Sequence, residues 1–130
     1  KVLKRFDIDV EVSFAELNWD SLMKMAAKHA VLYSELPKFQ AVKRDLALLV
    51  DQAVSFADIE KVARESERKL LKEVYLFDVY EGKNLPEGKK SYAVSFILQD
   101  ENKTLNDKQI DAIMNKIIAN LQQKLEAQLR

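Results

Sequence analysis

The chain has 130 residues, and its 21 Lys and Arg balance 21 Asp and Glu to a formal net charge of zero. This balance argues against a strongly basic nucleic-acid-binding protein, but it leaves room for a local basic patch. The sequence has no cysteine, which excludes disulfides and thiolate metal sites, and its single histidine, His29, does not suffice for a zinc site. No apolar run approaches the ~20 residues that span a bilayer, so we expect no membrane partner.

The first 36 residues predict one strand and one helix. Residues 6–15 alternate apolar and polar side chains, which is typical of a half-buried strand. Asn18 or Asp20 is a candidate N-cap for a helix that runs to about residue 30, on which His29 is expected to be an ordinary packing residue. Because one strand and one helix do not complete a sheet, we expect residues 1–36 to be the tail or linker of a preceding module in a longer protein.

Residues 37–130 predict a second domain, which begins after Leu36 because the residue before a proline is disfavoured in a helix. Apolar alternation predicts strands within 39–51, 74–80 and 91–99, and the terminal residues 126–130 fit a short edge strand. Two helices are expected between them. The first begins at a capping box of Ser55 and Asp58 and turns Ile59, Val62, Ala63 and Leu70 inward; the second begins at Asn106 with Gln109.

The order strand, helix, strand, strand, helix, strand predicts an α+β, ferredoxin-like βαββαβ sandwich. Its four antiparallel strands should lie in the order 4-1-3-2, with both helices on one face of the sheet. We expect the large apolar side chains to face the helices, among them Tyr75, Phe77, Val79, Tyr92, Val94, Phe96 and Leu98. The opposite, open face then gathers smaller and polar residues, which are Ala47, Leu49, Leu76, Asp78, Tyr80, Ser91, Ala93 and Ser95.

The open face has a composition that suits a flat ligand. Small residues form its floor, the Tyr80 ring offers a stacking surface, and the Asp78 carboxylate accepts hydrogen bonds from the edge of a base. Basic residues are expected around it as a rim for phosphates, and they are Lys38, Lys43, Arg44, Lys83, Lys89 and Lys90. The residues alone leave an alternative open, in which Tyr80 closes the hairpin, Asp78 caps its loop and the lysines only solvate it.

Signatures of catalysis are missing from the sequence. The two glycines, Gly82 and Gly88, both fall in the hairpin loop, so no glycine-rich phosphate loop exists. No Ser-His-Asp, Cys-His or metal-ligand cluster occurs either. We therefore expect no catalytic residue, cofactor or metal within this chain.

Five short motifs occur in order and at family-like spacing: 43–50, 76–82, 88–91, 104–105 and 129–130. Over residues 37–130, the chain resembles the ferredoxin-fold anticodon-binding domain that ends the beta chain of bacterial phenylalanyl-tRNA synthetases. It departs from the family pattern where Gln40 follows Phe39 in place of a proline and where Lys103–Asn106 replaces Arg-Thr-Leu-Thr. Neither departure touches the open face.

The resemblance implies a domain that binds the anticodon stem-loop of tRNA-Phe through Ala47, Asp78, Tyr80 and Ser91. It further implies a cytoplasmic ligase in which ATP, magnesium and phenylalanine react elsewhere, in an alpha2-beta2 heterotetramer formed with the rest of the beta chain and the alpha subunit. Two other functions stay open at this point. One is an ACT-like small-molecule regulatory domain, which usually has a glycine in the turn after its first strand, where 51–55 has none. The other is a purely structural assembly domain.

Overall fold

The computed structural model describes residues 2–28, 33 and 35–130, which form two compact units, Lys1–Glu35 and Leu36–Arg130. Each unit is described by itself. No helix within the described residues is long and apolar enough to cross a membrane.

The first unit contains a 3₁₀ turn, η1 (Leu3–Phe6), and a helix, α1 (Trp19–Ala26). The predicted cap is confirmed, because the Asn18 side chain accepts a hydrogen bond from the backbone N–H of Ser21 at 2.8 Å. The predicted strand over 6–15 is wrong: this stretch pairs with no strand among the described residues, and Phe14 is 85% exposed. Alternating side chains specify a strand only where another strand satisfies its backbone hydrogen-bonding groups. The predicted packing role of His29 stays a prediction, because His29 lies outside the described residues.

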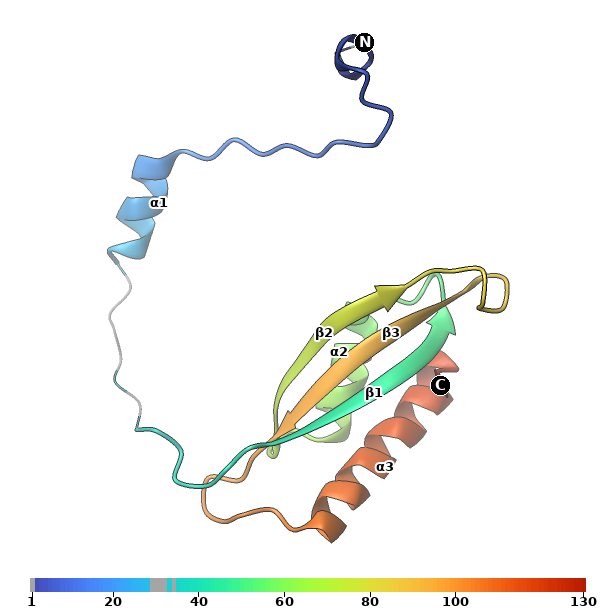
Figure 1. Ribbon diagram of the computed structural model, residues 1–130. Helices are drawn as coiled ribbons and strands as arrows, with labels where there is room; N and C mark the ends of the chain where they lie inside the picture. Colours follow the sequence, from blue (N-terminus) through green and yellow to red (C-terminus); the bar gives the residue numbers. More distant parts are fainter. Residues whose placement is uncertain (1, 29–32, 34) are drawn as a thin grey trace. The chain divides into compact units, whose positions relative to one another are not determined.

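The second unit has the predicted ferredoxin-like topology (Figure 1). Its four-stranded sheet has the order β2-β3-β1-β4, which is the predicted order 4-1-3-2 read from the other edge. The view in Figure 1 looks onto the open face, with α2 behind the sheet. In chain order the elements are β1 (Val42–Asp51), α2 (Phe56–Ser66), β2 (Leu71–Tyr80), β3 (Lys89–Leu98), α3 (Asp107–Leu125) and β4 (Gln128–Leu129).

Both helices of this unit begin at the predicted capping boxes. Ser55 and Asp58 exchange side-chain and backbone hydrogen bonds at the start of α2, and Asn106 and Gln109 do the same for α3. These bonds satisfy N–H groups that a helix leaves without an internal partner. At the other end of α3, Glu126 adopts a left-handed φ of 51°, which turns the chain back toward the sheet edge as β4.

The core lies between the sheet and the two helices. Phe96 and Val94 from β3 are fully buried there, with Leu48 and Val50 from β1 almost or completely so. Helix residues complete the core, among them Ile59, Val62, Ala63, Ile110, Ile117 and Leu121. Leu70 differs from the prediction: α2 ends at Ser66, so Leu70 follows the helix and packs against the core from the connection to β2.

Strand β2 does not follow the simple alternation that the sequence predicts. Val74 pairs with Phe96 and Leu76 with Val94, whereas the register shifts before Asp78, which pairs with Ala93. A residue inserted into one strand inverts the alternation of side chains beyond it. The prediction that Leu76 lies on the open face is therefore wrong, because Leu76 packs against the core.

The same irregularity moves aromatic residues to the open face. Tyr75 pairs with Ser95 of the open face, and the Phe77 ring lies 5.5 Å from Nζ of Lys43, an open-face residue of β1. Both rings were expected to face the helices, and that expectation is wrong. Their exposed fractions are 37% for Tyr75 and 53% for Phe77.

Candidate nucleic-acid interface

The open face is built from residues that pair across β1, β3 and β2. One row holds Leu49, Ser91 and Tyr80; the next holds Ala47, Ala93 and Asp78; a third holds Asp45, Ser95 and Tyr75. Rows two residues apart along a strand are separated by about 7 Å. The rows run from the hairpin loop toward the opposite end of the sheet.

The first two rows enclose a hollow of about 320 Å³. All four residues that the resemblance implied for RNA contact line it, so the structure brings Ala47, Asp78, Tyr80 and Ser91 together as expected. Two further residues complete the lining, Ala93 and Arg130. We call these six residues the sheet pocket. Its floor is made of alanine and serine, which leaves depth for a planar group above the strands.

Arg130 belongs to the sheet pocket although the sequence-based site did not include it. Its backbone N–H donates to the carbonyl of Ala47 at 3.0 Å, and its guanidinium carbon lies 5.5 Å from the centre of the Tyr80 ring. A guanidinium over a tyrosine ring makes a favourable cation–π contact. The signal that could have found it is the terminal edge strand, which the predicted strand order places beside Ala47.

The Tyr80 side chain is held over the turn that follows β2. A Cβ atom added at Gly82 would lie 2.1 Å from Oη and 2.2 Å from Cζ of Tyr80. Glycine is therefore needed at position 82 for the close approach of this ring, rather than for an unusual backbone angle. Tyr80 itself is 39% exposed, so one side of its ring is available to a ligand.

The basic residues that were expected around this face are placed differently by the structure. Lys89 lies at the end of the sheet, with its Nζ 4.0 Å from a carboxylate oxygen of Asp51. Lys90 is the next residue in the strand and points to the helix-covered side, where it is buried with its Nζ 4.7 Å from the centre of the Tyr92 ring. The expectation that Lys90 joins an open rim is therefore wrong, because successive strand residues point to opposite faces.

Arg44 does not lie on the open face either, because successive strand residues point to opposite faces of the sheet. It pairs with Phe96, a core residue, and its guanidinium lies 3.9 Å from the Asp107 carboxylate at the start of α3. Both groups are well exposed, so this ion pair adds little stability. It nevertheless directs Arg44 toward the helix side of the sheet.

A second group of side chains occupies the open face beyond the sheet pocket. Nζ of Lys43 lies 5.4 Å from the Tyr75 ring centre and 5.5 Å from that of Phe77. It also forms an ion pair with Asp45 at 3.6 Å, and Asp45 accepts a hydrogen bond from the Ser95 hydroxyl. The hydrogen bond with Tyr75 is the largest cause that raises the pKa of Lys43, and the same bond lowers the pKa of Tyr75. Lys43 therefore keeps its positive charge beside the two rings.

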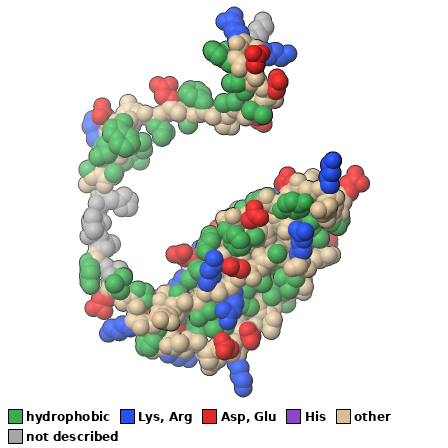
Figure 2. Space-filling view, in the orientation of Figure 1, with side chains coloured by type: hydrophobic (Ala, Val, Ile, Leu, Met, Phe, Trp, Pro, Cys, Tyr) green, Lys and Arg blue, Asp and Glu red, His purple; other side chains and the backbone are tan. Residues whose placement is uncertain are grey.

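Charged and apolar side chains are interspersed over this face rather than separated into one basic field (Figure 2). That distribution agrees with the zero net charge of the chain. The positive charge on this face therefore comes from individual residues such as Arg130, Lys89 and Lys43.

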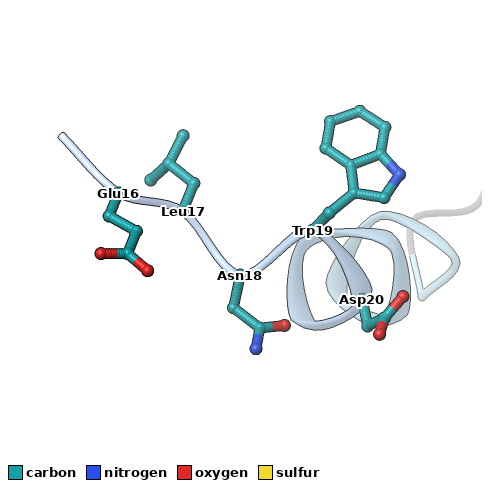
Figure 3. A pocket seen from close by; sticks show the side chains of 5 residues that line it. All are labelled: Glu16, Leu17, Asn18, Trp19 and Asp20. Carbon is teal, nitrogen blue, oxygen red and sulfur yellow. The ribbon is translucent and has the colours of Figure 1, made fainter.

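A larger hollow, about 570 Å³, lies at the start of α1 and is lined by residues 16–20. Figure 3 shows that Leu17 and Trp19 point to one side of the chain while Glu16 and Asn18 point to the other. These five consecutive residues do not converge on a common point, so we do not regard this hollow as a site. In the described part of the chain, no cluster of three or more His, Cys, Asp or Glu residues is arranged to hold a metal ion.

Comparison with known proteins agrees with this geometry. The family model described as "Ferredoxin-fold anticodon binding domain" matches residues 37–130. The chain is 65% identical over all 130 residues to the phenylalanine–tRNA ligase beta subunit of Bacteroides fragilis and 63% identical to that of Porphyromonas gingivalis. The corresponding subunit of Clostridium tetani is 46% identical over 129 residues. The chain spans 16% of the length of each of these relatives.

The family match covers residues 37–130, which is all of the second unit except Leu36 and includes every residue of the sheet pocket. The similarity to the phenylalanine–tRNA ligase beta subunit of Bacteroides fragilis also includes residues 1–36, because that protein aligns with the entire chain. The chain therefore belongs to the family of ferredoxin-fold anticodon-binding domains.

Proposed function

We propose that this chain binds the anticodon stem-loop of tRNA-Phe as part of a phenylalanine–tRNA ligase beta subunit. The observation that carries the proposal is the sheet pocket, which lies on the uncovered face of the sheet in a chain of this family. The pocket combines three elements with which proteins recognise unpaired nucleotides: a ring for stacking, an acceptor for the base edge and a positive charge for a phosphate.

Each of these roles falls to a different side chain. Tyr80 stacks on an unpaired base, for which ~1–3 kcal/mol is typical. The Asp78 carboxylate accepts hydrogen bonds and thus selects a base that presents amino or imino hydrogens at its edge. Ala47, Ala93 and Ser91 leave space for the base, and Arg130 neutralises an adjacent phosphate. The clustering of these groups favours this function over the ACT-like alternative.

The remaining steps of aminoacylation are assigned to other parts of the parent enzyme. We infer that ATP, magnesium and phenylalanine bind outside this chain, and that the rest of the beta chain and an alpha subunit complete a cytoplasmic alpha2-beta2 heterotetramer. Residues 1–36 are proposed to be the end of the preceding module and its link to the anticodon-binding domain. Support comes from the length of the relatives, whose similarity includes these residues.

The proposal is tested by titrating the chain with a labelled RNA hairpin that has the tRNA-Phe anticodon stem-loop sequence. A hairpin with the same stem and a scrambled loop is the matched control, since it keeps the phosphates and removes the base identities. We expect tighter binding of the native loop, and Tyr80→Ala should remove most of the difference. Equal affinity for both loops, or no binding of either, would overturn the proposal.

A further inference from the structure

We propose a second base-stacking subsite on the open face, formed by Tyr75, Phe77 and Lys43, which takes another unpaired nucleotide of the strand whose base occupies the sheet pocket. This inference rests on the proposed function and extends it. It identifies where the RNA continues after leaving the Tyr80 ring.

Exposure distinguishes Tyr75 and Phe77 from most large apolar residues of the sheet. Most large apolar residues of β1 and β3 are buried under the helices, whereas Tyr75 and Phe77 lie on the opposite face and keep 37% and 53% of their surface exposed. The register shift between Leu76 and Asp78 is what brings both rings to this side. Bulges of this kind re-aim side chains and are common beside functional sites.

The two rings also lie on the same face of the sheet as the sheet pocket. Tyr75 lies in the row after Asp78, so the two aromatic rings and the sheet pocket share one continuous surface across β2 and β3. Adjacent rows are separated by about 7 Å along the strands. Sheets that bind single-stranded RNA stack two or three bases on aromatic side chains of one such face.

A positive charge accompanies the two rings. The Lys43 ammonium lies within 5.5 Å of both ring centres, and half of the side chain is exposed. It is therefore positioned to contact the phosphate of a nucleotide whose base lies against the rings. A carboxylate oxygen of Asp45 lies 3.6 Å from Nζ of Lys43. This carboxylate can accept hydrogen bonds from a base, the role proposed for Asp78 in the sheet pocket. An RNA strand thus matches the alternation of rings and opposite charges along this face better than a purely apolar partner does.

The test is a set of double-mutant cycles between the protein and the RNA. One partner is the anticodon stem-loop hairpin with an abasic residue placed at each loop position in turn, and the other is the chain with Phe77→Ala, Tyr75→Ala or Tyr80→Ala. Val79→Ala is the matched control, because Val79 is a similarly exposed apolar residue of the same strand that pairs with the core residue Tyr92. Tyr75→Phe keeps the ring and tests stacking separately from the hydroxyl. Far-ultraviolet circular dichroism and urea midpoints verify that each variant is folded.

We expect Phe77→Ala and Tyr75→Ala each to weaken hairpin binding by roughly 5-fold to 150-fold, the range expected for loss of one stacked base. Each loss should vanish at one abasic position, and that position should differ from the one coupled to Tyr80→Ala. Tyr75→Phe and Val79→Ala should bind nearly as the unmodified chain does.

Three results would speak against the second subsite, and they separate it from the proposed function. If only Tyr80 couples to a loop position, the second subsite is wrong and the sheet pocket stands. If Phe77→Ala and Val79→Ala lower affinity equally at every position, the effect is not stacking and the inference again fails. If the unmodified chain binds no hairpin, both the proposed function and this inference fall.

Discussion

Replacement of Gly82 by alanine should weaken RNA binding without destabilising the fold, although Gly82 is not expected to touch RNA. The added Cβ would lie 2.1 Å from Oη of Tyr80, whereas ordinary contacts begin near 3.4 Å. The end of the ring must therefore move by more than about 1 Å, which exceeds the ~0.5 Å within which a binding side chain keeps its productive geometry. Because Tyr80 is partly exposed, the side chain has room to rotate out of the sheet pocket.

The expected size of the effect follows from these contacts. Loss of the Tyr80 stack corresponds to ~1–3 kcal/mol of binding free energy. The loss of RNA affinity caused by Gly82→Ala should therefore approach the loss caused by Tyr80→Ala. The free energy of unfolding should change by less than about 1 kcal/mol, since Gly82 has no left-handed φ and alanine restricts the unfolded chain.

Gly88 provides the matched control in the same loop. Its φ is 76° and a Cβ there meets nothing within 4 Å, so Gly88→Ala should cost about 1–2 kcal/mol of stability through backbone strain while leaving Tyr80 in place. Hairpin titration by fluorescence anisotropy and urea unfolding measure the two quantities. The reasoning is refuted if Gly82→Ala binds RNA normally, or if it weakens binding further in a Tyr80→Ala background, where no ring remains to be displaced.

Three further predictions address other parts of the domain. Asp78→Asn should weaken binding of the native loop more than binding of a scrambled loop, because an amide presents donors where the carboxylate only accepts. If competition binding shows an unchanged preference for the native loop, Asp78 does not recognise a base edge. Lys89→Ala should lower the slope of log affinity against log salt by up to about 0.7, because one phosphate contact is lost. Lys90→Met should leave the slope unchanged, since Lys90 is buried. Equal slopes for the unmodified chain and both variants would show that Lys89 does not contact RNA. The Ser55 hydrogen bonds lower the pKa of Asp58, so the ionised carboxylate stabilises the fold above its ordinary pKa of 3.8 and loses that contribution as pH falls through the lowered pKa. The difference in urea midpoint between Asp58→Asn and the unmodified chain should therefore narrow only below pH 3.8. A difference that stays constant with pH would show that the ionised Asp58 of the capping box does not cause it.

The sequence alone determined the architecture of the second unit, because its signals are local. Apolar periodicity, the caps at Ser55 and Asn106 and the hairpin loop each act within a few residues, and together they allow one common topology. The same alternation placed Ala47, Ser91 and Ala93 on the open face, since β1 and β3 have a regular register. With Asp78 and Tyr80, five of the six sheet-pocket residues are therefore assigned to the open face by the sequence, and only Arg130 is not.

Tertiary structure decided what depends on partners distant in sequence. The irregularity in β2 arises from pairing with β3, and no local signal marks Phe77 as the residue after which the alternation inverts. Arg130 enters the sheet pocket because β4 pairs with β1 across about eighty residues of intervening chain. Conversely, residues 6–15 have a strand-like pattern but pair with no strand among the residues that the structure describes. A strand needs a neighbouring strand to form its ladder of backbone hydrogen bonds, and side-chain alternation alone does not supply one.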